Sequence, residues 1–243
     1  MRTTGIAYVC LLAYPVIMLL VPDPNSIRWG WKTGGLEPLP PEIKERCGRN
    51  QWNLLIFKFF VLVVVCFFLI RQSSIPLHDV GIRRTQPVNL VILGLVTASL
   101  LILWACGLRS LTAKVASLKY GPPYLLRESI PKLICLIVLG AFAEEFWRAL
   151  SLIAFTKAGV SVFFAVIATS IVFGIGHVFS WKSVGGALGR MLGPCIAGIF
   201  CASLFLWFHS LFVPMSAHVL LNAFGTLTGR KRLIAKEESN LLV

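Results

Sequence analysis

The chain has 243 residues, of which 57% are hydrophobic and only 14% are charged, and its mean hydropathy is +0.81. Water-soluble chains carry about 25% charged residues, so this composition excludes an ordinary soluble domain. The net charge of +13 does not indicate a nucleic-acid-binding protein, because lysines and arginines are spread over the segments between apolar runs. We therefore predict an all-α fold, a polytopic transmembrane helix bundle in contact with the lipid bilayer and with no nucleic-acid partner.

Seven apolar runs have lengths near the ~20 residues that a helix needs to cross a bilayer. In chain order they cover residues 6–21, 54–70, 88–108, 133–155, 160–179, about 185–208, and 213–227. Helices are favoured over strands, because membrane barrels show segments of roughly ten residues with alternating polarity. The first run follows Arg2 but ends without a small-residue cleavage site, so we expect a retained helix rather than a signal peptide.

The distribution of basic residues predicts the orientation of these helices. Lysine and arginine concentrate in the connections after the first and third runs and in the tail, which places these segments in the cytoplasm. The N-terminus would then lie on the other side. We expect an integral, multi-pass protein of a prokaryotic plasma membrane. Its parts would be N-terminal membrane helices with a polar interfacial loop (1–79), a membrane core (80–228) and a basic C-terminal tail (229–243).

Three charged residues interrupt the fourth run, in the stretch GAFAEEFWRAL: Glu144, Glu145 and Arg148. A charge near the middle of a spanning helix costs roughly 2.5–3.5 kcal/mol on insertion scales, so such residues are usually partnered and functional. Arg148 follows Glu144 by four residues and Glu145 by three, so on a helix it can meet either carboxylate. A purely structural ion pair with Arg148 would neutralise one glutamate and would leave the other without a charge partner.

Two further runs carry polar residues that could serve the remaining carboxylate. His177 lies near the end of the fifth run in FGIGHVFS, four residues after Phe173 and on the same helical face. His218 and Asn222 are four residues apart in PMSAHVLLNAFG and also share a face. The seven cysteines form no CxxC pair and lie mostly in apolar runs, where cysteine acts as a small hydrophobic residue.

These motifs, in this order and each on its own predicted helix, resemble those of the CAAX protease and bacteriocin-processing (CPBP) family of intramembrane glutamic proteases. That family includes the Ras-converting CAAX endoprotease. The resemblance covers about residues 80–228, with VGIRR before the core and SLFVPMSAHVLLN around the third motif. It implies an intramembrane endopeptidase that cleaves a membrane-associated protein or peptide substrate without a required metal, and it makes 80–228 the catalytic core.

The first motif departs from the family pattern, because EExxxR is shortened to EEFWR. If Arg148 is aligned, Ala143 occupies the catalytic position, which suggests a protein without activity. If the glutamate pair is aligned, Glu144 is the base and Arg148 is shifted by one residue, about 100° around the helix. We prefer the second alignment because it keeps a base.

Amide hydrolysis needs a general base that activates water and donors that stabilise the oxyanion. We expect Glu144 to be the base, with Glu145 held by Arg148 and turned away from the fifth and seventh runs, since neighbouring positions differ by about 100°. The FxxxH histidine would align the water or share the proton, and the HxxxN pair would polarise the scissile carbonyl in one shared polar cavity. The candidate catalytic residues are Glu144, Glu145, Arg148, His177, His218 and Asn222.

Three alternatives stay open. One carboxylate and two histidines can bind zinc, although the HExxH helix of membrane zinc proteases is absent, and we expect no cofactor. A non-catalytic, CPBP-like immunity or scaffold protein would explain the shortened first motif. A proton-coupled transporter would also bury glutamate, histidine and arginine, but it would predict inverted repeats with broken helices, which the sequence does not show.

Overall fold

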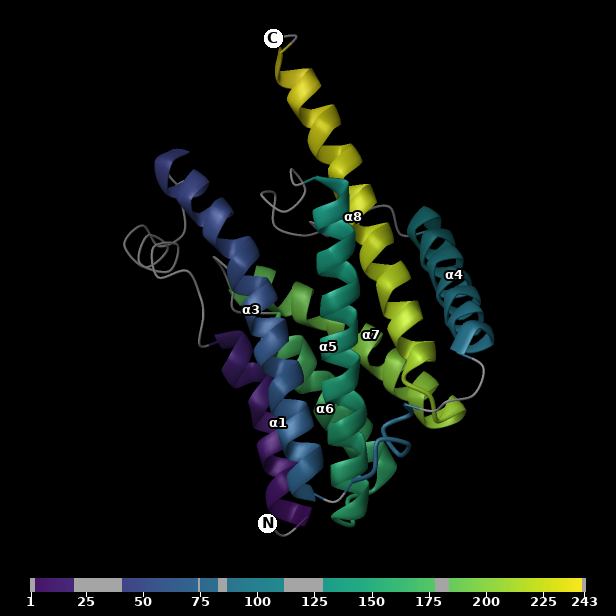
Figure 1. Cartoon of the computed structure of the whole chain (residues 1–243). Coiled ribbons are helices and arrows are strands. Elements are labelled where there is room, and N and C mark those ends of the chain that lie inside the picture. Colours follow the sequence, from purple (N-terminus) through teal and green to yellow (C-terminus); the bar gives the residue numbers. More distant parts are fainter. Residues whose placement is uncertain are drawn as a thin grey trace.

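The computed structural model describes residues 3–19, 41–73, 75–82, 87–111, 129–177 and 184–241. Within these residues the chain forms seven α-helices and no strand (Figure 1). They are α1 (Thr3–Leu19), α3 (Pro41–Ser73), α4 (Pro87–Leu111), α5 (Ile130–Lys157), α6 (Val162–Gly176), α7 (Val184–Phe208) and α8 (Phe212–Leu241). Each helix overlaps one of the seven predicted runs, so the all-α prediction is confirmed for the described part of the chain.

Two segments of the described chain are long and apolar enough to cross a membrane, Leu55–Ser73 in α3 and Met191–Phe208 in α7. Shorter apolar stretches lie in α1, α4 and α6. The apolar part of α5 is interrupted by Glu144, Glu145 and Arg148. Seven membrane crossings therefore stay a prediction, as does the division of the chain at residues 80 and 229.

Helix α5 lies at the centre of the bundle (Figure 1), where it contacts α1, α3, α6, α7 and α8. Helix α4 packs on α8 at the periphery, and α6 packs on α7. Every residue from 143 to 152 of α5 is buried. The stretch that holds the charged residues is thus enclosed by protein rather than exposed on the surface of the bundle.

Polar contacts hold α1 against its neighbours in this apolar bundle. The indole Nε1 of Trp147 in α5 donates to the carbonyl oxygen of Cys10 at 2.6 Å. The ammonium of Lys58 in α3, a cation that is only 9% exposed, donates to the carbonyl oxygen of Met18 at 3.0 Å near the end of α1. These contacts fix α1 both along its length and at its C-terminal end.

A turn at Gly81, which precedes α4 in the chain, contacts the residue just before α8. Gly81 has φ +81°, and its carbonyl oxygen accepts the backbone N–H of Leu211 at 3.2 Å. A Cβ at this position would lie 2.5 Å from the nitrogen of Leu211, so both the left-handed backbone and the close approach require glycine. The turn therefore anchors the connection between α7 and α8, seven residues before His218.

Candidate active site

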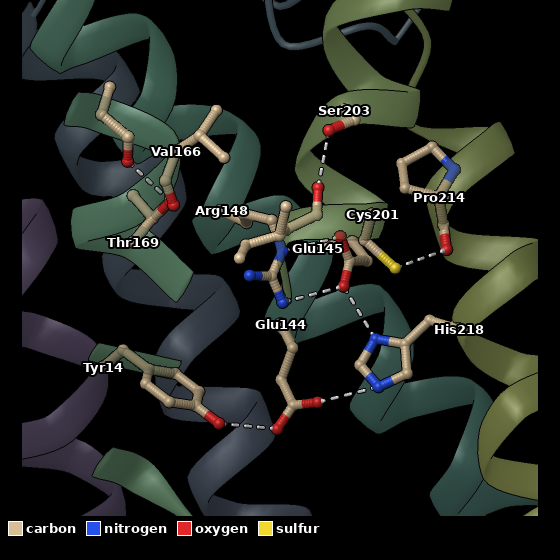
Figure 2. Close-up of polar contacts among 12 residues, drawn as sticks. Tyr14, Glu144, Glu145, Arg148, Val166, Thr169, Cys201, Ser203, Pro214 and His218 are labelled. Atoms are coloured by element: carbon tan, nitrogen blue, oxygen red, sulfur yellow. Dashed lines mark hydrogen bonds and ion pairs between the residues drawn. The ribbon is translucent and has the colours of Figure 1, made fainter. Parts of the chain in front are cut away.

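Two neighbouring glutamates of α5 meet one histidine of α8 (Figure 2). Nδ1 of His218 lies 2.7 Å from Oε1 of Glu145, and its Nε2 lies 3.5 Å from Oε2 of Glu144. All three residues are at most 6% exposed. The expectation that only one glutamate would face α6 and α8 is wrong, because the two nitrogens of a single imidazole reach both carboxylates.

The geometry around His218 defines where a proton can lie. A carboxylate oxygen only accepts hydrogen bonds, so Nδ1–H of His218 donates to Glu145. One further proton can lie between Nε2 and Glu144, on either partner. The imidazole bridges the two carboxylates, and Arg148 pairs with Glu145. Such pairing is what permits charged groups to be buried.

Arg148 forms a bidentate interaction with Glu145. Its Nε donates to Oε2 at 3.0 Å, and its Nη2 donates to Oε1 at 3.2 Å. The guanidinium carbon also lies 4.2 Å from the centre of the Phe173 ring in α6. Glu145 and Arg148 thus form the predicted pair in spite of the shorter spacing, because residues three apart share a helix face.

The third nitrogen of the guanidinium, Nη1, is buried and finds no hydrogen-bond partner among the described residues. It points toward Gly198 of α7, where a Cβ would lie only 2.9 Å away. The missing side chain of Gly198 therefore leaves room for Arg148 in the centre of the bundle.

His177 caps the end of α6 and lies at the margin of this cluster. Its Nδ1–H donates to the carbonyl oxygen of Phe173 at 2.8 Å, which leaves Nε2 as the other ring nitrogen. The Phe173 ring contacts both imidazoles edge-on, with centroids 4.6 Å from His177 and 5.8 Å from His218. No hydrogen bond joins His177 to either glutamate in the described chain.

Asn222 is half-buried and lies one turn after His218 on α8. It makes no hydrogen bond with the described residues. A single polar cavity shared by Glu144, His177, His218 and Asn222 therefore stays a prediction, although Glu144 is buried and contacts one of the two histidines as expected.

Tyr14 of α1 is a site residue that the sequence analysis missed. Its hydroxyl donates to Oε1 of Glu144 at 2.9 Å (Figure 2). The residue is fully buried. A buried tyrosine hydroxyl usually finds a partner, but the first apolar run holds both Tyr8 and Tyr14, and the sequence does not tell the buried one from the exposed one. The identity of that partner depends on how α1 packs on α5.

One group of donor atoms in the described chain has metal-binding spacing. It consists of Glu145, Cys201 and His218, whose ligand atoms lie within 4.8 Å of one another. This group differs from the zinc set that the sequence suggests, one glutamate and two histidines. It contains Cys201, which the sequence indicates as a hydrophobic residue, and it lacks His177. A divalent ion here would have to break the 2.7 Å hydrogen bond between His218 and Glu145 and lie near Arg148.

A family model described as Rce1-like, type II CAAX prenyl endopeptidase, matches residues 126–224. This segment contains the six candidate residues found in the sequence, whereas Tyr14 lies before it. The match confirms the family resemblance that the glutamate pair and the two histidine motifs indicate. Searches of curated proteins and of solved structures found no match.

Proposed function

Because residues 126–224 are Rce1-like, we propose that the protein is an intramembrane endopeptidase that uses water activated by Glu144. The observation that carries this proposal is the buried contact of Glu144 and Glu145 with His218. Charged side chains inside an apolar bundle are costly and usually functional. The substrate would be a membrane-associated protein or peptide.

The membrane location is also part of the proposal. Its support is the 57% hydrophobic composition, the two candidate spans in α3 and α7, and the family match. Helix α1 begins and α8 ends at opposite ends of the bundle (Figure 1), which agrees with an odd number of crossings. We propose a multi-pass protein of a prokaryotic plasma membrane.

Glu144 is the better base because its oxygens are less occupied. Glu145 accepts three hydrogen bonds, two from Arg148 and one from His218. Glu144 accepts one hydrogen bond from Tyr14 and has a longer contact of 3.5 Å with His218. Free lone pairs remain on Glu144 to take a proton from water.

The reaction follows from these contacts. Glu144 takes a proton from water while the water oxygen attacks the carbonyl carbon of the substrate. The C–N bond then breaks, and the proton passes to the leaving nitrogen, which gives a carboxylic acid and an amine. His218 lies next to Glu144 and shares this proton. We therefore assign His218 to proton transfer rather than to the oxyanion.

Two groups remain for the substrate. The amide of Asn222 has no partner among the described residues and would donate to the oxyanion. Nδ1 of His177 is occupied by the Phe173 carbonyl, so its Nε2 would align the attacking water. This mechanism uses no metal, so chelators should leave activity unchanged.

The test uses the full-length protein in liposomes and two peptides that end in the CAAX sequence, one prenylated and one with a free cysteine. Cleavage is followed by mass spectrometry, with and without a chelator. Glu144→Gln should abolish turnover, and Glu145→Gln should retain a measurable residual activity. Preference for the prenylated peptide would support the substrate class in the family description.

Other outcomes identify which step is wrong. If Glu145→Gln is inactive and Glu144→Gln is only impaired, the base has been misassigned. If a chelator stops cleavage and added zinc restores it, the metal-free mechanism is wrong. If neither peptide is cleaved, the N-termini of membrane proteins are sequenced from cells that express the wild type and from cells that express Glu144→Gln. Identical sets of N-termini in the two membranes would overturn the endopeptidase proposal.

A non-catalytic scaffold or immunity protein is the second candidate, supported by the shortened EEFWR motif. Cells that carry the Glu144→Gln variant of such a protein would keep the wild-type phenotype.

A further inference from the structure

We propose that Tyr14 is a positioning residue whose hydroxyl holds the Glu144 carboxylate toward His218. Helix α1 would then supply part of a site whose other residues all lie within 126–224. The inference rests on the proposed hydrolytic function, because positioning has meaning only if Glu144 is the base.

The two oxygens of Glu144 have different partners. Oε1 accepts the hydroxyl of Tyr14 at 2.9 Å, and Oε2 lies 3.5 Å from Nε2 of His218. The terminal torsion of a glutamate side chain is broad, so one contact of 3.5 Å does not fix the plane of the carboxylate. The shorter hydrogen bond from Tyr14 fixes it, and with it the direction of the lone pairs that receive the proton from water.

The Tyr14 ring is itself held by packing. It stacks on Trp147 with centroids 4.5 Å apart and lies 5.6 Å from the Phe173 ring. A Cβ on Gly176 would lie 2.4 Å from Cε1 of Tyr14, so this residue of α6 must be glycine for the ring to fit. One turn earlier on α1, the Cys10 carbonyl accepts the Trp147 indole. The hydroxyl is therefore presented by a rigid support, as a positioning group requires.

A purely structural explanation would be that the buried hydroxyl needs any acceptor. In that case its loss would lower thermal stability and leave the turnover of folded protein unchanged. A positioning role instead predicts a lower kcat with an unchanged KM, because the orientation of the base affects the chemical step and not substrate binding.

The test is Tyr14→Phe, which keeps the ring and its stacking and removes only the hydroxyl. We expect kcat on the prenylated CAAX peptide to fall by about tenfold to a hundredfold, as small displacements of a catalytic group do, with KM unchanged. The matched control is Tyr8→Phe on the same helix, since Tyr8 is 60% exposed and makes no hydrogen bond with the described residues. It should behave as wild type. A normal kcat for Tyr14→Phe, or a change in KM alone, would overturn the proposal.

A second measurement separates this proposal from the hydrolytic function. The infrared carboxylate band of Glu144, identified by its loss in Glu144→Gln, should shift in Tyr14→Phe and stay in place in Tyr8→Phe. If the band shifts but the wild type hydrolyses no peptide bond, the proposed function has failed and the contact with Tyr14 stands. If the band does not shift, Tyr14 does not position the carboxylate.

Discussion

Arg148 is the cation that pairs with the buried carboxylate of Glu145 in α5. Its guanidinium donates twice to Glu145 and lies on the Phe173 ring, and the residue is 1% exposed. Removing one partner of such a pair leaves an uncompensated buried charge, which costs much more than the pair itself contributes.

We therefore expect Arg148→Ala to lower the free energy of unfolding by about 3–5 kcal/mol and to lower activity as well. Thermal unfolding in detergent, with peptide cleavage measured in parallel, tests this. Arg148→Ala combined with Glu145→Gln removes the charge on both sides and should regain part of the lost stability. An Arg148→Ala protein with normal stability and activity would show that Arg148 does not hold Glu145.

Helices α4 and α8 approach closely at Gly94. A Cβ at this position would lie 2.0 Å from Oγ of Ser216 and 2.3 Å from the carbonyl oxygen of Val213. Both residues belong to the first turns of α8, just before His218. A larger residue at Gly94 must therefore displace the part of α8 that carries a candidate catalytic side chain.

Gly94→Leu should destabilise the protein by about 1–3 kcal/mol through overpacking and should reduce turnover by shifting His218. Gly193→Ala in α7 is the control, because a Cβ there meets nothing within 4 Å. Alanine is also the better helix former, so this variant should be neutral or slightly stabilised. Melting temperatures that fall equally in both variants would contradict the close contact between α4 and α8.

Taken as a whole, the chain runs from one end of the bundle at the start of α1 to the other end at the close of α8 (Figure 1). The basic residues predict that the C-terminal tail is cytoplasmic. Epitope tags at the two termini, digested by protease in sealed vesicles of known orientation, test this. The C-terminal tag should be cut from the cytoplasmic face and the N-terminal tag from the other. Cleavage of both tags from the same face would show an even number of crossings.

The sequence by itself determined the helical class, the order of the seven helices and most of the candidate site. Apolar runs encode helices through local length and composition, and each run overlaps a helix, although α3 begins well before its run and α8 ends well after its run. The contact between Glu145 and Arg148 was also predictable, because spacing within one helix fixes which side chains can meet.

Only the tertiary structure decided that His218 contacts both glutamates and that Tyr14 and Cys201 join the cluster. These contacts join α5 to α1, α7 and α8, across 130 residues in the case of Tyr14 and Glu144. Helical periodicity fixes the face on which a side chain lies, but not which helix packs against that face or at what depth. That choice depends on close packing of the whole bundle, which glycines such as Gly81, Gly176 and Gly198 permit where two elements approach.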